Sequence, residues 1–416
     1  VLKNKSNSVV VTGIDDVNAQ AVVLAINEML GSKAFDAAAP KYVRQGNVRA
    51  VNALLADMKS GKVGALLMDG VNPAYSLPNA ADFAEAIKNV DLTVAFSTNR
   101  NETTELVQYV GASNHYLESW GDAQLKKGHY GLMQPTIKEL FDTRQIQGAL
   151  LQWMDSDKTY YDYIKETWST GILAGNDWSQ ALHDGVFVAA PIMEEEVVEA
   201  IAPIAGVEVE APSAVPLASA IRSLSGATAE GMELTLYSKV GMGDGQQASN
   251  PWLQEFPDPI TRVSWDTYVT VSKADAEKLG LVNENVANGG LNGSYVKLTV
   301  DGVAIDGVPV IVQPGQAPGS LGLSFGYGKT VGMKSEMQTG VNAYGLYSNF
   351  SSTQAVTIEK SAGMHEFACV QLHKTLMGRG DIIKETTLEI FNTKDAKEWN
   401  VVPVVSLDHQ EVPATS

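Results

Sequence analysis

The segment Val63–Pro73 reads VGALLMDGVNP, and the segment Leu92–Leu106 reads LTVAFSTNRNETTEL. Each contains a short continuous apolar run, Ala65–Met68 in the first and Leu92–Ser97 in the second. Such runs are typical of strands that are buried on both faces of a parallel sheet. A helical pattern over Asn79–Lys88 separates them. The sequence therefore predicts one right-handed strand–helix–strand unit.

The loops that follow these two strands are the first candidates for a binding site. Ligands of open parallel sheets bind outside the carboxyl ends of the strands. We therefore expect the loops Asp69–Ser76 and Thr98–Thr104 to lie side by side at that edge. Proline disfavours the helical conformation in the residue before it, so Asn72-Pro73 is predicted to keep a helix from starting in the first loop.

The rest of the N-terminal half continues the alternation of strands and helices. Val9–Thr12 is predicted as a buried strand, and an aspartate then caps a helix over Val17–Met29 that Gly31 ends. A second helix is predicted over Val48–Met58, and Leu125–Thr143 is predicted as an irregular crossing. Further helices are predicted over Gln145–Trp153, Tyr160–Trp168 and Glu194–Ile201, and a short strand over Gly185–Ala190.

The pattern changes in the C-terminal half. From Met232 onward, apolar residues recur at every second position in short runs, as in half-buried strands. The pairs Asp301-Gly302 and Asp306-Gly307 are typical of hairpin turns, and a single short helix is predicted over Lys273–Leu279. Many short strands with one or two small helices favour a β-barrel.

Charge and cysteine content exclude several classes of function. The 416 residues carry a net charge of -18, which disfavours binding to nucleic acid and would attract a basic partner. The single cysteine, Cys369, excludes an internal disulfide. It also excludes an iron–sulfur cluster held by this segment alone, because such clusters need about four thiolates. The six histidines show neither an HExxH motif nor close pairing with the cysteine, so a zinc site is not expected.

Several motifs resemble the molybdopterin oxidoreductase family. These are the GxNP and SLP motifs between the two strands, the TNxNETTEL motif after the second strand, and LESWGD at Leu117–Asp122. The segments NPWLQEFPDPITR (Asn250–Arg262), GVNA (Gly340–Ala343) and QLHKTLMGR (Gln371–Arg379) are similar to one subgroup of the family. That subgroup is the fused molybdopterin-like and iron–sulfur subunit of bacterial alternative complex III.

The resemblance implies an α/β fold, with a doubly wound, mostly parallel sheet followed by a small double-psi-type β-barrel domain. Residues 1–204 would form the α/β domain, residues 205–231 a linker, and residues 232–392 the barrel. Residues 393–416 would form a tail. We expect the native polypeptide to continue beyond Ser416 into a cysteine-rich domain with iron–sulfur clusters.

The function that the resemblance implies is that of an oxidoreductase subunit in the respiratory chain. This segment would be a scaffold without a molybdenum cofactor or a catalytic group, and electrons from quinol would pass through iron–sulfur clusters elsewhere in the subunit. Haem c subunits, integral membrane quinol-binding subunits and a terminal oxidase would be its partners. The location would be the periplasmic side of the inner membrane, where partner subunits would hold it peripherally.

Two alternatives stay open. The chain could belong to an active molybdopterin-dependent oxidoreductase, similar to polysulfide or thiosulfate reductase, and would then hold molybdopterin guanine dinucleotide. It could also be an unrelated nucleotide-binding enzyme. Gln108 and Gly111-Ala112 depart from the aspartate and the Leu-Pro pair of active family members, which favours the scaffold.

The candidate cofactor-binding residues lie in the two loops and in the barrel. The first loop offers Asp69, Gly70, Asn72 and Pro73, the second offers Asn99 and Glu102, and the barrel offers Asn342. Each set has a structural alternative. The first loop could be a tight turn, the second could cap a helix, and Asn342 could bond the barrel backbone.

Two other motifs have a functional and a structural interpretation. Gly322–Gly326 matches the GxSxG elbow of hydrolases, but no helical pattern follows it, so a glycine-rich crossing of the barrel is predicted. His115 and Glu118 lie near the presumed ligand edge, and a structural role is predicted for both.

Overall fold

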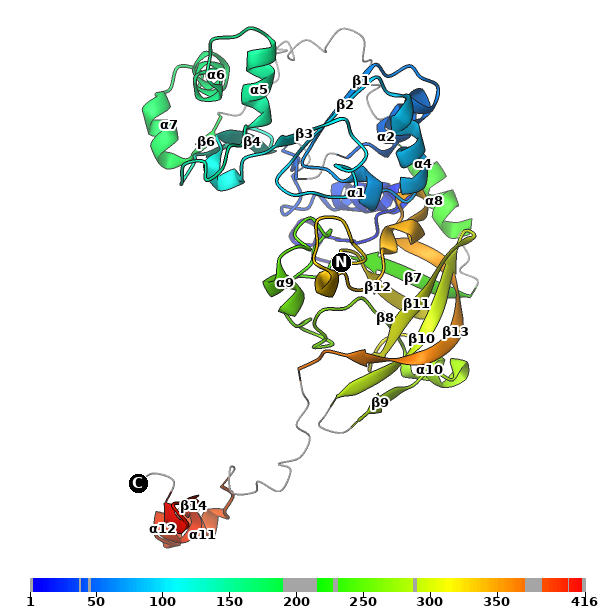
Figure 1. Cartoon of the computed structure of the whole chain (residues 1–416), viewed down its shortest axis with the longest axis vertical. Coiled ribbons are helices and arrows are strands. Elements are labelled where there is room, and N and C mark those ends of the chain that lie inside the picture. The colour runs from blue at the N-terminus through cyan, green and yellow to red at the C-terminus, as the bar shows by residue number, and fades with distance from the viewer. Residues whose placement is uncertain are drawn as a thin grey trace.

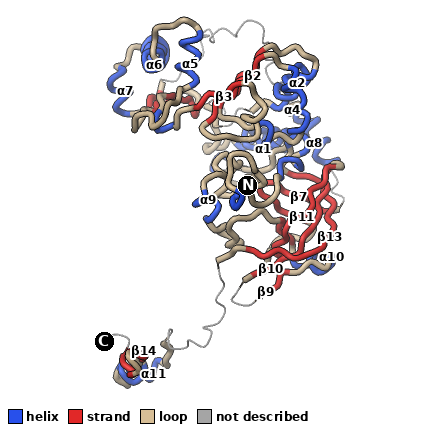
Figure 2. Tube along the Cα trace, in the orientation of Figure 1, coloured by secondary structure: helices blue, strands red, loops and turns tan. Residues whose placement is uncertain are grey.

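The chain folds into a mixed α/β structure with an open parallel sheet and a closed six-stranded β-barrel (Figure 1). The computed structural model describes residues 3–36, 39–43, 46–189, 215–226, 231–286, 290–370, 384–402 and 404–413. The helices gather in the N-terminal part, whereas the strands dominate the barrel (Figure 2). Part of the linker prediction, the helix predicted over Glu194–Ile201 and the motif Gln371–Arg379 lie outside the described residues.

The first helices form as their capping residues predict. Helix α1 (Val17–Leu30) begins at Asp16, whose carboxylate accepts from the backbone of Asn18 and Ala19, and ends at Gly31 with a φ of 56°. Helix α2 (Val48–Lys59) begins at Asn47 in the same manner. A short 3-10 turn, η1 (Lys5–Asn7), precedes them.

The strand predicted over Val9–Thr12 is wrong. The segment takes no strand conformation, and Val11 is 82% exposed. The backbone amide and carbonyl of Val10 bond the side-chain amide of Asn27, each at 2.8 Å. A helix side chain therefore supplies the hydrogen bonds that a neighbouring strand would have supplied.

The parallel sheet is small and lies in chain order. Strands β1 (Ala65–Asp69), β2 (Leu92–Ser97) and β3 (Tyr109–Ala112) pair in the order β1-β2-β3. The predicted doubly wound arrangement is therefore wrong for the described strands, because the strand order never reverses. Between β1 and β2 lie α3 (Pro73–Ser76), α4 (Ala80–Ala86) and η2 (Ile87–Asn89).

Two details of this unit differ from prediction. Strand β1 buries only alternate residues, and Leu67 is 42% exposed, so the strand is not buried on both faces. Helix α3 starts at Pro73, contrary to prediction, because proline is favoured at the first helical position, where its missing N–H costs nothing. The core between sheet and helices contains Leu55, Met58, Leu66, Met68, Phe83, Ala86, Ile87, Val90 and Ala95.

A separate lobe follows β3. The stretch predicted as an irregular crossing instead starts within a hairpin of β4 (Gly121–Lys126) and β5 (His129–Met133), which turns at Gly128 with a φ of 76°. Strand β6 (Val186–Val188) extends this antiparallel sheet. Aromatic side chains fill its core, where Trp168 is fully buried. The helical elements of the lobe are η3 (Tyr116–Glu118), α5 (Ile146–Trp153), α6 (Tyr160–Thr167), a π-helical turn (Trp168–Ile172) and α7 (Trp178–Asp184).

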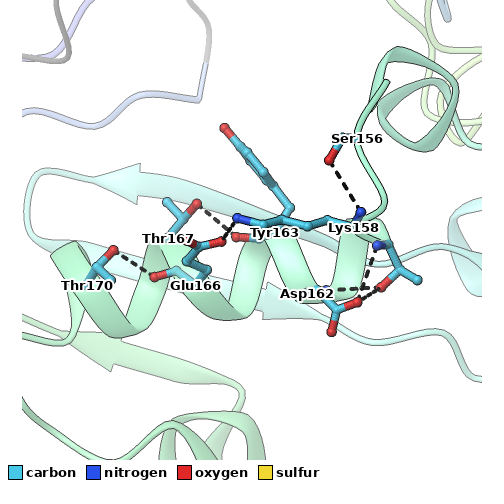
Figure 3. Close-up of polar contacts among 8 residues, drawn as sticks. Ser156, Lys158, Asp162, Tyr163, Glu166, Thr167 and Thr170 are labelled. Carbon is cyan, nitrogen blue, oxygen red and sulfur yellow. Dashed lines mark hydrogen bonds and ion pairs between the residues drawn. The ribbon is translucent and has the colours of Figure 1, made fainter. Parts of the chain in front are cut away.

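Helix α6 shows why this lobe is helical despite its weak periodicity (Figure 3). Thr159 and Asp162 form a capping box at its N-terminus. Lys158 forms an ion pair with Glu166 across two turns, and the Thr167 hydroxyl donates to the Tyr163 carbonyl at 2.9 Å. Local bonds of this kind stabilise the helix in addition to its packing in the lobe.

The barrel closes through six strands. The order is β11-β8-β12-β7-β13-β10, and β10 pairs again with β11. The pairs β11–β8 and β12–β7 are parallel, and the others are antiparallel. The strands are β7 (Met232–Tyr237), β8 (Val269–Val271), β10 (Leu291–Val300), β11 (Val303–Val312), β12 (Ser320–Ser324) and β13 (Thr353–Phe367), with β9 (Asn283–Asn285) added beside β10.

Helices around the barrel complete this part. Helix α10 (Lys273–Leu279) is bracketed by Ser272 and Gly280, as predicted. Helix α8 (Leu217–Gly226) lies within the stretch predicted as a linker and packs against α1. The remaining helical elements are α9 (Pro251–Glu255), η6 (Ser335–Met337), η7 (Ala343–Leu346) and η8 (Ser348–Phe350).

Of the two predicted hairpin turns, Asp301-Gly302 is confirmed between β10 and β11. Asp306-Gly307 is not a turn but a bulge inside β11, where both residues oppose one residue of β10. The Asp306 carboxylate accepts from the amide of Gly307 and the hydroxyl of Ser361. The Asp306-Gly307 pair, which the local pattern predicted as a turn, is thus part of the contact between β11 and β13.

The last described residues form a small unit of their own. Helices α11 (Leu388–Thr393) and α12 (Ala396–Trp399) pack together, with the rings of Phe391 and Trp399 5.5 Å apart. Strands β14 (Val404–Leu407) and β15 (Gln410–Pro413) form a hairpin. Within the described residues, we find no helix long and apolar enough to span a membrane.

A candidate ligand crevice between the sheet and the barrel

A polar crevice of about 250 Å³ lies where the carboxyl ends of the parallel strands meet loops of the barrel. Four of the predicted site residues line it, namely Asp69, Gly70, Asn72 and Asn99. The crevice thus lies at the edge of the sheet where ligands of parallel sheets bind. The other lining residues are Val71, Ser97, Thr98, Arg100, Asn101, Ser113, Asn114, Gln246, Ser249, Lys329, Val331 and Met333.

The two loops predicted to lie side by side are bonded to each other, which confirms their placement. The Asn72 side-chain oxygen accepts from the amide of Thr103 at 3.0 Å and from its hydroxyl at 2.8 Å. The Asn72 amide nitrogen donates to the Glu102 carboxylate at 2.7 Å. The polar groups of Asn72 are therefore turned toward the second loop.

The second loop is held by hydrogen bonds within itself. The Asn101 side chain accepts from the backbone of Thr103 and Thr104, each at 3.0 Å. No helix follows between β2 and β3, so these bonds stabilise a turn and the predicted helix cap is wrong. The other Glu102 oxygen accepts from the amide of Thr330 at 3.3 Å. Glu102 therefore connects the sheet edge to the barrel and does not line the crevice.

Two other predicted site residues also lie outside the crevice lining. Pro73 is the first residue of α3. Asn342 caps η7 through Tyr344, and its amide nitrogen donates to the Tyr75 carbonyl at 3.0 Å. Asn342 thus forms hydrogen bonds with backbone atoms of the barrel, at Tyr344, and of helix α3, at Tyr75.

Among the ionisable side chains that line the crevice, Asp69 and Lys329 have opposite charge and a shifted pKa. Partial burial raises the pKa of the Asp69 carboxyl, and burial lowers the pKa of the Lys329 amine. The Lys329 amine donates to the Gly245 carbonyl at 3.1 Å and lies 5.1 Å from the ring centre of Tyr75. Sequence reasoning missed Lys329. The sequence feature that could have identified Lys329 is its position inside the glycine-rich stretch Gly326–Gly332, where the chain comes close to other backbone.

Glycines allow this close approach. A Cβ atom on Gly332 would come within 2.3 Å of the Arg100 carbonyl oxygen, and one on Gly328 within 2.2 Å of the Asn342 amide. Both residues also have positive φ, of 72° and 71°. The barrel loop can therefore rest directly on the backbone of the sheet edge.

Two buried polar atoms of the crevice residues have no hydrogen-bond partner, the Ser113 hydroxyl oxygen and the Asn114 side-chain carbonyl oxygen. Buried polar atoms normally have partners. A polar ligand with hydrogen-bond donors could satisfy both. The crevice is therefore suited to a small polar group.

The other motifs take structural positions. His115 caps η3, and the Glu118 carboxylate accepts from the amides of His115 and Leu140, so the predicted structural role is confirmed for both. Backbone hydrogen bonds lower the pKa of Glu118. Ser324 is fully buried at the end of β12 with no helix after it, so GxSxG forms no elbow here. Across the described residues, no cluster of histidine, cysteine and carboxylate side chains is placed to hold a metal ion.

Comparisons with known proteins give one weak structural similarity and no sequence match. No family model and no curated protein sequence matches it. Among solved structures, it is similar to acetylene hydratase from Pelobacter acetylenicus, with 14% identity and a TM-score of 0.47. The match covers 74% of this chain and 46% of that one, so the chain spans less than half of that structure. A likeness this weak assigns neither a family nor an activity.

Proposed function

We propose that this chain is the molybdopterin-like scaffold of a respiratory electron-transfer subunit, and that it holds no molybdopterin guanine dinucleotide. Its crevice would serve assembly of the sheet and the barrel, with no reaction inside it. The double-psi connectivity of the barrel belongs to the same proposal. The assignment to a quinol-oxidising complex of the alternative complex III type rests on the sequence resemblance alone.

The main support for the proposal is that the crevice is small and that the polar side chains beside it bond to each other. Pockets for drug-sized ligands measure roughly 300–1,000 Å³, and this crevice measures about 250 Å³. A dinucleotide with a pterin is larger than a drug-sized ligand, and we infer that this crevice does not take one. Asn72 and Glu102, which could meet a nucleotide, instead bond each other and the barrel loop at Thr330.

A second candidate function has its own observation. The unpartnered oxygens of Ser113 and Asn114 favour a polar ligand with the size of a single nucleoside or less. In that case the chain would be a nucleotide-binding protein, with Asp69 at the strand end as the acceptor for a ribose hydroxyl.

Metal and nucleotide analysis of the purified full-length native protein tests both candidates. The scaffold proposal expects neither molybdenum nor tungsten, and no guanine nucleotide in the supernatant after acid precipitation. About one metal and one or two dinucleotides per chain would overturn it. A free mononucleotide without pterin would support the second candidate.

The proposed membership of this protein in a respiratory complex is tested by a separate experiment. We expect the tagged native protein, solubilised from membranes in mild detergent, to run in one complex with haem-staining subunits on a native gel. Quinol should reduce those haems. A protein that elutes alone from the soluble fraction would overturn this part of the proposal.

A further inference from the structure

The barrel carries a hydrogen-bonded row of tyrosine, histidine and aspartate that the proposed function does not use. Strands β10 and β13 pair side by side and bring Tyr295 and His365 together (Figure 1). The Tyr295 hydroxyl lies 2.8 Å from Nδ1 of His365. Nε2 of the same ring bonds the carboxylate of Asp266, from the loop before β8.

The aspartate decides which way the protons point. An ionised carboxylate can only accept hydrogen bonds, so Nε2 of His365 carries the proton and donates it to Asp266. In the neutral imidazole, Nδ1 is then left with a lone pair and accepts from the Tyr295 hydroxyl. The phenol thus donates to a base that a third group orients, the arrangement by which proteins activate a hydroxyl.

The row is partly shielded from water, which strengthens its hydrogen bonds. The side chains of His365 and Asp266 are 20% and 14% exposed. The Phe367 ring packs against the imidazole with 4.8 Å between ring centres. Burial raises the pKa of Tyr295, and the charge of Asp266 adds to this, so the phenol keeps its proton at neutral pH.

We propose that Tyr295 is a redox-active tyrosine, and that His365, held by Asp266, accepts its proton. A strong one-electron oxidant, such as hexachloroiridate(IV), takes one electron from the phenol. The phenolic proton moves along the existing hydrogen bond to Nδ1. The products are a neutral phenoxyl radical, an imidazolium paired with the carboxylate, and the oxidant reduced by one electron, so charge and atoms balance.

Two other buried tyrosines, Tyr75 and Tyr344, donate to no such base. The hydroxyl of Tyr75 donates to the Tyr327 carbonyl at 2.8 Å, and that of Tyr344 donates to the Asp244 carbonyl at 3.1 Å. An amide carbonyl does not take up a proton at neutral pH, so oxidation there would leave a charged phenol. The proposal is independent of the crevice, because an electron can reach Tyr295 without a substrate cavity.

Stopped-flow oxidation of the full chain with hexachloroiridate(IV) tests the proposal, with freeze-quenched samples read by electron paramagnetic resonance. We expect a phenoxyl radical in the wild type that Tyr295→Phe removes. The matched control is Tyr109→Phe, at a more exposed tyrosine in β3, which should leave the signal unchanged. An equal signal in the wild type and in Tyr295→Phe would overturn the proposal.

A second variant separates the proton acceptor from a structural role. A general base commonly contributes roughly 10²–10⁴-fold to a rate, so we expect His365→Ala to slow oxidation of Tyr295 by about tenfold or more. Added imidazole should restore the rate, because it can occupy the space of the lost ring and take the proton. A rate unchanged by His365→Ala, or a slowed rate that imidazole fails to restore in a variant with wild-type circular dichroism, would refute the role of His365.

Discussion

At the scale of single residues, the most unusual groups are the lysines buried against aromatic rings. The Lys239 amine lies 3.9 Å from the ring centre of Tyr268 and donates to the Asp266 carbonyl at 3.0 Å. Burial lowers the pKa of Lys239 to about 8. A sequence shows such a lysine only as one of 30 basic residues, because burial depends on the strands that close around it.

The pKa of Lys239 makes stability depend on pH. Between the folded pKa of about 8 and the unfolded value of 10.5, the unfolded chain binds more protons, so stability rises with pH. We expect a gain on the order of 2 kcal/mol between pH 7 and pH 9.5, measured by urea unfolding. Lys239→Met should flatten the curve relative to the wild type, whereas Lys59→Met, at an exposed ion pair, should not. Parallel curves for the wild type and Lys239→Met would contradict the assignment.

The bond between Asn72 and Glu102 gives a second prediction at this scale. In Asn72→Asp, an oxygen replaces the amide nitrogen that donates to Glu102 at 2.7 Å, so two carboxylates face each other. We expect a loss of about 2 kcal/mol at pH 7, because a partly buried hydrogen bond becomes a repulsion. Below about pH 5, where one carboxyl binds a proton, most of the loss should be recovered. Asn99→Asp, on the exposed side of the crevice, is the control, and an equal loss in both variants would argue against this network.

At the scale of elements, local signals predicted the ends of helices well and the ends of strands less well. Asp16 and Gly31 bracket α1, and Ser272 and Gly280 bracket α10, because a cap acts within one turn of its own helix. The missing strand at Val9–Thr12 and the bulge at Asp306-Gly307 depend on partners far away in the sequence. Strand pairing is non-local, so a local pattern cannot fix it.

The loop that seats the barrel on the sheet edge offers a prediction about one element. Gly332→Ala adds a Cβ within 2.3 Å of the Arg100 carbonyl oxygen, at a φ of 72°. Gly315→Ala has a similar φ of 85° but meets nothing within 4 Å, so it reports the conformational cost alone. We expect about 1 kcal/mol for the control and about 2 kcal/mol more for Gly332→Ala, measured as free energies of unfolding. Equal losses would mean that the loop does not rest on Arg100.

At the scale of the whole molecule, Tyr75 connects the sheet domain to the barrel. Its ring belongs to the barrel core and lies 5.3 Å from the ring of Tyr344, although the residue comes from α3. Its hydroxyl donates to the Tyr327 carbonyl, and its own carbonyl accepts from Asn342. The two domains therefore share one buried side chain and should unfold together.

This coupling can be measured by calorimetry. We expect Tyr75→Ala to split a joint transition of the sheet domain and barrel into two, because the cavity and the lost bond weaken the contact by about 3–5 kcal/mol. Tyr75→Phe keeps the ring and loses only the hydroxyl bond, so it should shift the joint transition by about 1–3 kcal/mol without splitting it. A single transition in Tyr75→Ala would show that other contacts are enough to couple the unfolding of the sheet domain and the barrel.

The sequence by itself determined the strand–helix–strand unit, the edge where the crevice lies, most helix ends and the change to a barrel after Met232. These features follow from periodicity and capping, which act over a few residues. The tertiary structure alone decided that Asn72 and Glu102 face each other, that Lys329 enters the crevice, and that Tyr295 meets His365. Such contacts join residues from separate strands and loops, and their geometry exists only once the barrel has closed on the sheet.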